Sequence, residues 1–420
     1  MLNKLGTREL AYVAKIAWVR PIQGADNIEL VGILGWTCIA KKNEFKEGDL
    51  AIYFEIDSKL PATEWSEFLA SKNYKVKTMK LNKFKVISQG LALPASAFGG
   101  ICYQDGDGQF YLSFDKNSWF KEILSFKEGD FLTEKLKVTY SVEEDNKRKA
   151  NVNPDAKLNA ALGRHPKIAK KYGKIIKRNK FLRWIFLLLF GRKKDNATSF
   201  PTKFQYVKKS DEERCENMPW ILENKTPFIK TTKIDGTSTL FILERKPFNK
   251  REFYVCSRNV RQLTPNQKTY HSDNVYWSVE FKYHIKDFLE DMLKQHPEWT
   301  YVALQGETAG IGEDGGKIQG DPHKFGELRF FGYNFIDSVK GRWNSIDAKN
   351  LVSKYGIEWV PIVDENYILP DNFEEFKLSA DGLCEAPGAT GLREGYVYRN
   401  AENPNLSFKN VSRKYLLKYS

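Results

Sequence analysis

The chain has 420 residues, enough for two or three domains of ordinary size. It has no run of about 18 apolar residues that could span a bilayer, and we expect no secretory signal because the N-terminus lacks an apolar core. The five cysteines form no CxxC pair and the five histidines no HxxxH pair. This composition argues against a disulfide scaffold or a zinc ribbon. It predicts a cytoplasmic protein in which any metal is a hard cation bound by oxygen.

The net charge of +13 is concentrated in one part of the chain. Residues 147–195 contain sixteen Lys or Arg and two Asp, a net charge of +14. The remainder has 50 basic and 51 acidic residues and is almost neutral. A local positive stripe of this kind is typical of a surface that binds a polyanion.

Residues 1–135 predict a small β domain, because short apolar or alternating runs are separated by Gly, Asp and Pro. Many short strands at this spacing favour a barrel or a sandwich, with an OB-like β-barrel among the options. The expected strands are Leu10–Ile16, Leu30–Ile33, Thr37–Ala40, Leu50–Glu55 and Leu91–Pro94.

Residues 136–199 predict a basic linker with helical character. The stretch Lys167–Phe190 combines lysines with spaced apolar residues, as in a basic amphipathic helix. Three interpretations stay open: a solvated linker whose apolar end packs on a neighbouring domain, a nucleic-acid contact, and a helix at a membrane surface.

Residues 200–420 predict a domain of mixed α and β structure, with strand-like runs separated by helical stretches such as Tyr276–Gln295. The expected strands are Thr237–Leu243, Phe253–Ser257, Tyr301–Leu304, Arg329–Ile336 and Tyr396–Tyr398.

An ordered series of short motifs runs through this last region. It begins with a KxDG tetrad, Lys233-Ile234-Asp235-Gly236, which is a weak signal alone because it arises by chance in about one such chain in ten. The motifs that follow are Ser257-Arg258-Asn259, Gln305-Gly306-Glu307, Phe330-Phe331-Gly332-Tyr333-Asn334-Phe335, Glu394-Gly395-Tyr396-Val397 and Ser407-Phe408-Lys409.

In this order the motifs resemble those of the covalent nucleotidyltransferases, and most closely those of ATP-dependent RNA ligases with an N-terminal OB module. Residues Asp211–Arg214, Gly24–Asp26 and Ser88–Leu91 are also similar to these ligases. The resemblance implies an α+β protein. An OB-like nucleic-acid-binding domain (1–135) and the linker (136–199) would precede an adenylyltransferase domain (200–420) with ATP-grasp-like antiparallel sheets and helices.

The resemblance implies that Lys233 attacks the α-phosphate of ATP to form a lysyl–AMP adduct. The pKa of a free lysine is about 10.4, so a neutral amine at about pH 7 needs a pKa lowered by roughly three units. We expect a bound divalent cation, Mg²⁺ or Mn²⁺, and the Lys409 ammonium to lower it, because each disfavours a second positive charge nearby. The same cations would neutralise charge on the α-phosphate.

The resemblance also implies roles for the other motif residues. Arg258 and Glu307 would hold a phosphate and the ribose. Tyr333 falls at the position that stacks on adenine, with Phe331 as the rival because strand alternation would put both side chains on one face. Glu394 would help to hold the metal, and Asp235 would assist it.

One position departs from the pattern of these enzymes, which commonly carry a KxK pair in the last motif. Here the residue two before Lys409 is Ser407. Either Lys409 acts alone, or Lys414 or Lys418 contributes the second charge.

The function that follows is an ATP-dependent RNA ligase, expected to be monomeric, that seals 3′-OH/5′-phosphate nicks in nucleic acid. A DNA ligase or a GTP-using capping enzyme shares the KxDG tetrad and is the alternative within enzymes. A nonenzymatic RNA-binding protein is the alternative from another class, suggested by the first domain and the basic segment.

Overall fold

The computed structural model describes residues 1–2, 7–140, 199–209, 211–269, 271 and 273–419, with scattered positions from 158 to 186. The chain divides into two compact units, one formed by Met1–Thr139 with Phe200–Ser420 and the other by Tyr140–Ser199. Most of the predicted basic helix at 167–190 and most of the basic segment 147–195 lie outside the described residues. Their roles, and the domain boundaries at 135 and 199, stay predictions.

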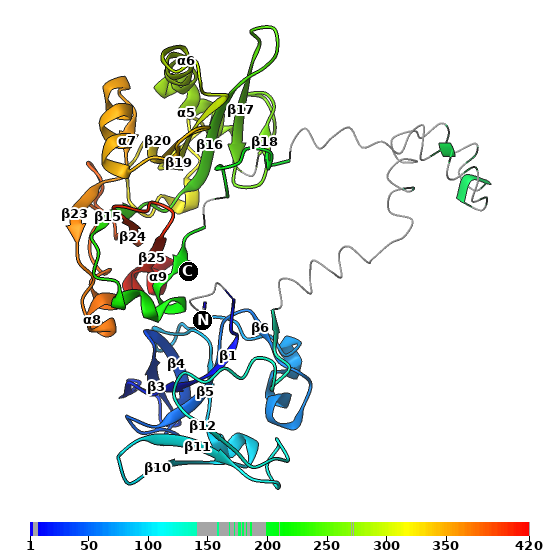
Figure 1. The fold of residues 1–420 in the computed structure, drawn as a ribbon, viewed down its shortest axis with the longest axis vertical. Coiled ribbons are helices and arrows are strands. Elements are labelled where there is room, and N and C mark those ends of the chain that lie inside the picture. Colours follow the sequence, from blue (N-terminus) through cyan, green and yellow to red (C-terminus); the bar gives the residue numbers. More distant parts are fainter. Residues whose placement is uncertain are drawn as a thin grey trace. The chain divides into compact units, whose positions relative to one another are not determined.

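The first domain is built from small antiparallel sheets (Figure 1). One contains β1 (Ala11–Lys15), β5 (Leu50–Phe54) and β9 (Leu91–Leu93), and a second contains β2 (Trp18–Pro21), β3 (Ile28–Ile33) and β4 (Trp36–Lys41). A third contains β10 (Ile101–Gln104), β11 (Phe110–Phe114) and β12 (Leu124–Phe126), and the remaining pairs are β7 (Met79–Leu81) with β8 (Val86–Ser88) and β6 (Ser58–Lys59) with β13 (Thr139–Tyr140). The five predicted strands are confirmed as β1, β3, β4, β5 and β9.

Alternating side chains of these strands form the core of the first domain. Val31, Cys38 and Tyr53 are each fully buried in one hydrophobic cluster. Short 3-10 helices at Glu64–Lys72 and Ala95–Phe98 lie between the strands.

Two sheets dominate residues 200–420 (Figure 1). The five-stranded sheet has the order β14 (Glu213–Arg214), β25 (Ser407–Val411), β24 (Gly395–Asn400), β15 (Phe228–Lys233) and β23 (Ile362–Tyr367). The other has the order β18 (Arg261–Gln262), β17 (Arg251–Ser257), β16 (Thr237–Arg245), β19 (Tyr301–Ala309), β20 (Arg329–Asp337) and β21 (Gly341–Arg342), and β22 (Glu358–Trp359) pairs with β20. The five predicted strands of this region are confirmed as β16, β17, β19, β20 and β24.

The predicted helical stretch 276–295 consists of two helices, α5 (Val275–Tyr283) and α6 (Ile285–Gln295). The break occurs at His284, whose φ of 51° is left-handed and cannot continue a right-handed helix. The other helices of this region are α7 (Ser345–Val352), α8 (Phe373–Leu378) and α9 (Arg413–Tyr419).

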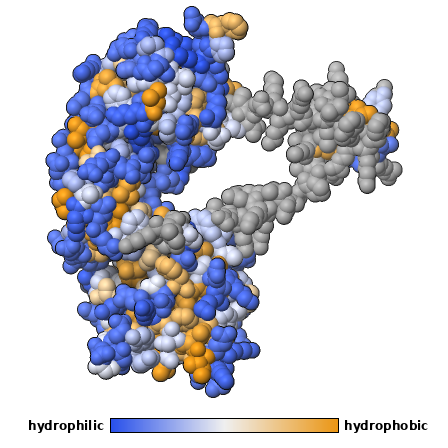
Figure 2. Space-filling model, viewed as in Figure 1, coloured by the Kyte–Doolittle hydropathy of each residue, from blue (hydrophilic) through white to orange (hydrophobic). Residues whose placement is uncertain are grey.

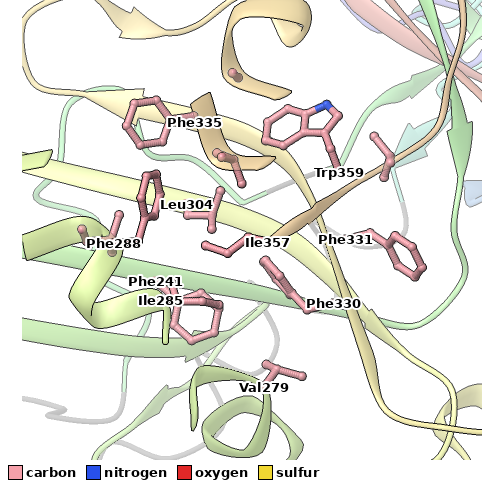
Figure 3. Packing of buried hydrophobic residues seen from close by; sticks show 14 of the residues in the cluster. Phe241, Val279, Ile285, Phe288, Leu304, Phe330, Phe331, Phe335, Ile357 and Trp359 are labelled. Carbon is pink, nitrogen blue, oxygen red and sulfur yellow. The ribbon is translucent and has the colours of Figure 1, made fainter. Parts of the chain in front are cut away.

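The largest core cluster packs α5 and α6 against β16, β19 and β20 (Figure 3). Phe288 of α6 lies in it with Phe241 and Leu304 from the strands, all with at most 1% of their surface exposed. Burying such side chains stabilises the domain by about 1.5–3 kcal/mol each. This core therefore gives the neighbouring site a rigid base.

The KxDG tetrad lies at the junction of the two sheets. Lys233 ends β15 in the five-stranded sheet, and Thr237 begins β16 in the other. A Cβ atom at Gly236 would lie 2.2 Å from the carbonyl oxygen of Thr308 in β19, closer than real atoms approach. Glycine is therefore required for the chain to cross between the sheets against β19.

Among the described residues, no helix is both long and apolar enough to cross a membrane. The face seen in Figure 2 is largely hydrophilic, with hydrophobic side chains in separate patches.

Candidate active site

A cavity of about 420 Å³ opens between the edges of the two sheets. It is lined by all seven residues predicted to form the site: Lys233, Asp235, Arg258, Glu307, Tyr333, Glu394 and Lys409. Four of them lie on separate strands (β15, β19, β20 and β25), and the other three lie in segments directly beside strands. The fold therefore collects side chains that are far apart in the sequence around one space, and their individual roles stay predictions.

Lys233 and Glu394 form the central ion pair of this cavity. Strands β15 and β24 are antiparallel, and their register places Lys233 opposite Gly395, next to Glu394. The Lys233 Nζ donates a hydrogen bond to Glu394 Oε2 at 2.6 Å. The amine that would act as nucleophile is thus held in place by a carboxylate.

The protein's own groups raise the pKa of Lys233, and the lowering expected from a bound cation stays a prediction. Burial by itself lowers the pKa, but attraction to the carboxylates of Glu394, Glu307 and Asp235 outweighs burial and raises it above the ordinary value. Positive charge brought close to these carboxylates would act in the opposite direction and favour the neutral amine.

Three acidic groups meet around this amine. Burial, reinforced by repulsion from Glu394 and Asp235, raises the pKa of Glu307 to about 8 even though Lys233 acts in the opposite direction. Burial also raises the pKa of Glu394. Such crowding of acidic groups suits a divalent cation, which often takes one or two protein carboxylates and further ligands from phosphates. Among the described residues, no group of three or more His, Cys, Asp or Glu side chains could hold a metal by itself.

Asp235 is held by two residues that the motif analysis missed. Its backbone N–H donates to His323 Nε2 at 2.8 Å, and the Tyr415 hydroxyl donates to its Oδ2 at 2.5 Å. His323 is fully buried, and its Nδ1 lies 3.0 Å from the carbonyl oxygen of Leu392. This arrangement fixes a neutral imidazole with a proton on Nδ1. The spacing of His323 and Tyr415 in the sequence gave no signal of this role.

Asp211 connects the two predicted phosphate-binding cations. Its Oδ2 accepts from Arg258 Nη2 at 2.7 Å, and its Oδ1 accepts from Lys409 Nζ at 3.2 Å. Burial acts to raise the pKa of Asp211, but Lys409 and Arg258 lower it below the usual range. A carboxylate thus bridges two cations as a phosphate group could. The sequence indicated this residue through the stretch Asp211–Arg214, which is similar to the RNA ligases.

The structure distinguishes Tyr333 from its rival Phe331. Tyr333 lines the cavity and its hydroxyl lies 3.1 Å from Ser238 Oγ, whereas Phe331 is fully buried in the large core cluster (Figure 3). The expected alternation fails because the β19–β20 register shifts there: Gly332 pairs with Gly306, and Asn334 pairs with Gln305. The extra residue is a β-bulge, which reverses the direction of later side chains.

Substitution of the two aromatic residues should separate nucleotide binding from stability. We expect Tyr333→Leu to raise the KM for ATP about 10-fold through lost base stacking, with little change in Tm. Phe331→Ala should instead lower the free energy of unfolding by about 3–5 kcal/mol, because it leaves a cavity in the core. Thermal unfolding and initial rates of nucleotide transfer measure both effects. An unchanged KM in Tyr333→Leu would remove Tyr333 from the binding site.

Two protein-family models match the chain. The OB-fold domain family matches residues 10–95, and the RNA ligase family matches residues 226–419, which include most of the cavity. The comparison with curated proteins gave no match.

Solved structures of Naegleria gruberi RNA ligase resemble the whole chain at 26% sequence identity. A mutant with AMP and Mn has a TM-score of 0.57 and covers 98% of this chain and 99% of its own. A mutant with ATP and Mn has a TM-score of 0.54, with 98% of each chain covered. The ligase with PPi has a TM-score of 0.56 and coverages of 98% and 99%. Together with the motif residues in the cavity, these matches support an RNA ligase with an N-terminal OB-fold domain.

Proposed function

We propose that this ligase seals RNA 3′-OH/5′-phosphate nicks through an AMP adduct on Lys233. The proposal rests on the position of the Lys233 amine. It lies 2.6 Å from Glu394 Oε2, in a cavity that Arg258 and Lys409 also line. Positive groups around a reactive amine are what nucleophilic attack on a nucleotide phosphate requires.

The proposed reaction has three balanced steps. The neutral Lys233 amine forms a bond to the α-phosphorus of ATP, one of its two protons is lost while the other stays on the nitrogen, and pyrophosphate leaves. The 5′-phosphate of the nucleic acid then attacks the same phosphorus, and the lysine leaves and regains a proton. Finally the 3′-OH attacks the activated 5′-phosphate, AMP leaves, and a phosphodiester bond remains.

ATP and a divalent cation, Mg²⁺ or Mn²⁺, fit the cavity. Glu394, assisted by Asp235, would hold the cation, and its charge would offset the carboxylates that keep the pKa of Lys233 high. The N. gruberi ligase structures with ATP and Mn and with AMP and Mn support this choice.

The remaining residues would position the nucleotide. Tyr333 would stack on adenine and Glu307 would hold the ribose. Arg258 and Lys409, which both contact Asp211, would exchange this carboxylate for phosphate oxygens. An anion that carries more charge than one carboxylate competes well for such a pair of cations.

The OB domain would contact the nicked duplex or the 3′-OH strand, since OB folds commonly bind nucleic acid. The monomeric state and the cytoplasmic location belong to the proposal as well. The five cysteines, all of which are free, support a reducing compartment.

A sealing assay with matched nicks tests the substrate. We expect a nick with an RNA 3′-OH to be sealed with ATP at least about 10-fold faster than the same nick with a DNA 3′-OH. GTP should give less than a tenth of the lysine labelling that ATP gives. Equal sealing of both nicks would favour the DNA ligase alternative, and preferential labelling by GTP would favour a capping-type enzyme. Binding of RNA with no covalent adduct would favour the nonenzymatic alternative.

A further inference from the structure

Arg399 lines the cavity and was not among the predicted site residues. It lies on β24, with 3% of its surface exposed, and its Nη2 contacts Glu212 Oε1 at 3.3 Å. Its Nε and Nη1 are buried and have no hydrogen-bond partner among the described residues. Buried donors are nearly always paired, so two unpartnered N–H groups on one guanidinium indicate an acceptor that the chain itself does not supply.

The surroundings of Arg399 carry excess positive charge. Glu212 contacts two residues: its Oε2 accepts a hydrogen bond from the Ser407 hydroxyl, and its Oε1 faces Arg399. Arg342 also faces this carboxylate, and burial together with repulsion from Arg399 lowers the pKa of Arg342. The Nε of Arg342 likewise has no partner among the described residues. One carboxylate therefore faces two guanidinium groups, that of the buried Arg399 and that of the half-buried Arg342, and an additional anion would balance them.

The sheet register places Arg399 next to the departure in the last motif. Strands β24 and β25 are antiparallel, and Arg399 pairs directly with Ser407. Directly paired residues of a sheet project their side chains on the same face. The positive charge that a lysine at position 407 would carry is thus present on Arg399 of the neighbouring strand.

The two lysines considered as substitutes do not fill this role. Lys414 and Lys418 are exposed on α9, and neither lines the cavity. The Arg399 guanidinium, by contrast, lies 5.9 Å from the centre of the Tyr333 ring, within reach of a nucleotide that stacks on this ring.

We propose that Arg399 binds a phosphate oxygen of the nucleotide and supplies the second cationic contact that a lysine at position 407 would otherwise make. The inference rests on the proposed function and adds a binding residue to it. A guanidinium suits this task because its planar donors can bind a phosphate while one donor keeps its contact with Glu212. Arg399 thus binds the nucleotide, whereas Lys233 reacts with it.

The test uses the full-length protein and two readouts. We expect Arg399→Ala to raise the KM for ATP in adduct formation about 10- to 100-fold, in line with the loss of a charge-assisted hydrogen bond. Binding of AMP should weaken by a similar factor while binding of adenosine, which has no phosphate, stays within about two-fold of wild type. Adding Ser407→Lys to Arg399→Ala should recover most of the loss. Lys414→Ala and Lys418→Ala serve as controls and should behave as wild type.

A second variant covers the case in which Arg399→Ala does not fold. Arg399→Gln keeps a polar side chain at this position, leaves Glu212 facing Arg342, and should show the same selective loss for AMP. If wild type forms no adduct, the proposed function fails. If wild type forms the adduct and the Arg399 variants match its KM, the inference alone fails. Equal losses for AMP and adenosine, or no rescue by Ser407→Lys, would also overturn it.

Discussion

Lys233→Ala is expected to abolish transfer of label from [α-³²P]ATP to the protein and to reduce joining of nicked RNA by about 10⁴-fold or more. The effect is this large because the first two steps pass through the side chain, and loss of a covalent nucleophile leaves only binding and electrostatic assistance. Labelling of denatured protein, followed by initial rates of sealing, measures both quantities. Adduct at the wild-type level in this variant would remove Lys233 from the mechanism.

The same variant allows a sharper separation of steps. Because the third step uses an RNA that already carries AMP on its 5′-phosphate, Lys233→Ala should still seal a pre-adenylated nick, within about 10-fold of wild type. Lys230→Ala is the matched control: it lies three residues earlier on β15, and its ammonium faces the rings of Tyr367 and Tyr396 outside the cavity lining. It should form the adduct normally.

Glu394→Gln should slow adduct formation about 100-fold, because the variant loses the charge expected to hold the metal. It should also change the pH dependence in a defined direction. Adduct formation needs the neutral amine, so the wild-type rate should rise with pH. Glu394 is the strongest of the carboxylates that raise the pKa of Lys233. Its neutralisation should lower that pKa and move the rising limb of the rate profile to lower pH.

Glu365→Gln is the control for this change, since Glu365 is an exposed carboxylate on β23 of the same sheet and does not line the cavity. Initial rates of adduct formation between pH 6 and 10, at saturating ATP and metal, provide the profile. A Glu394→Gln profile that stays in place or moves to higher pH would contradict the electrostatic role given to this carboxylate.

The sequence predicted the main strands of both domains, and the seven residues that it named for the site all line one cavity. Strands such as β5 and β16 could be predicted from their local sequence, because their apolar runs end at Gly, Asp or Pro. The site was predictable because Lys233, Glu307 and Lys409 lie in short motifs at the ends or within such strands. Their convergence on one cavity follows from the resemblance, which the spacing of motifs alone would not establish.

Other features depend on long-range geometry and could not be predicted. The bulge that turns Tyr333 into the cavity exists only in the pairing of β20 with β19, so simple alternation left Phe331 as a rival. His323 and Arg399 carry no local pattern, and their contacts join segments far apart in the chain. The direction of the Lys233 pKa shift depends on three carboxylates meeting at one point, which no motif spacing reveals.

Mass spectrometry of the protein after incubation with ATP and Mg²⁺ or Mn²⁺ tests the central claim most directly. We expect an added mass equal to one AMP on the intact chain, mapped by peptide analysis to Lys233 and lost when pyrophosphate is added in excess. Absence of this added mass under conditions in which RNA is sealed, or its location on another residue, would contradict the account.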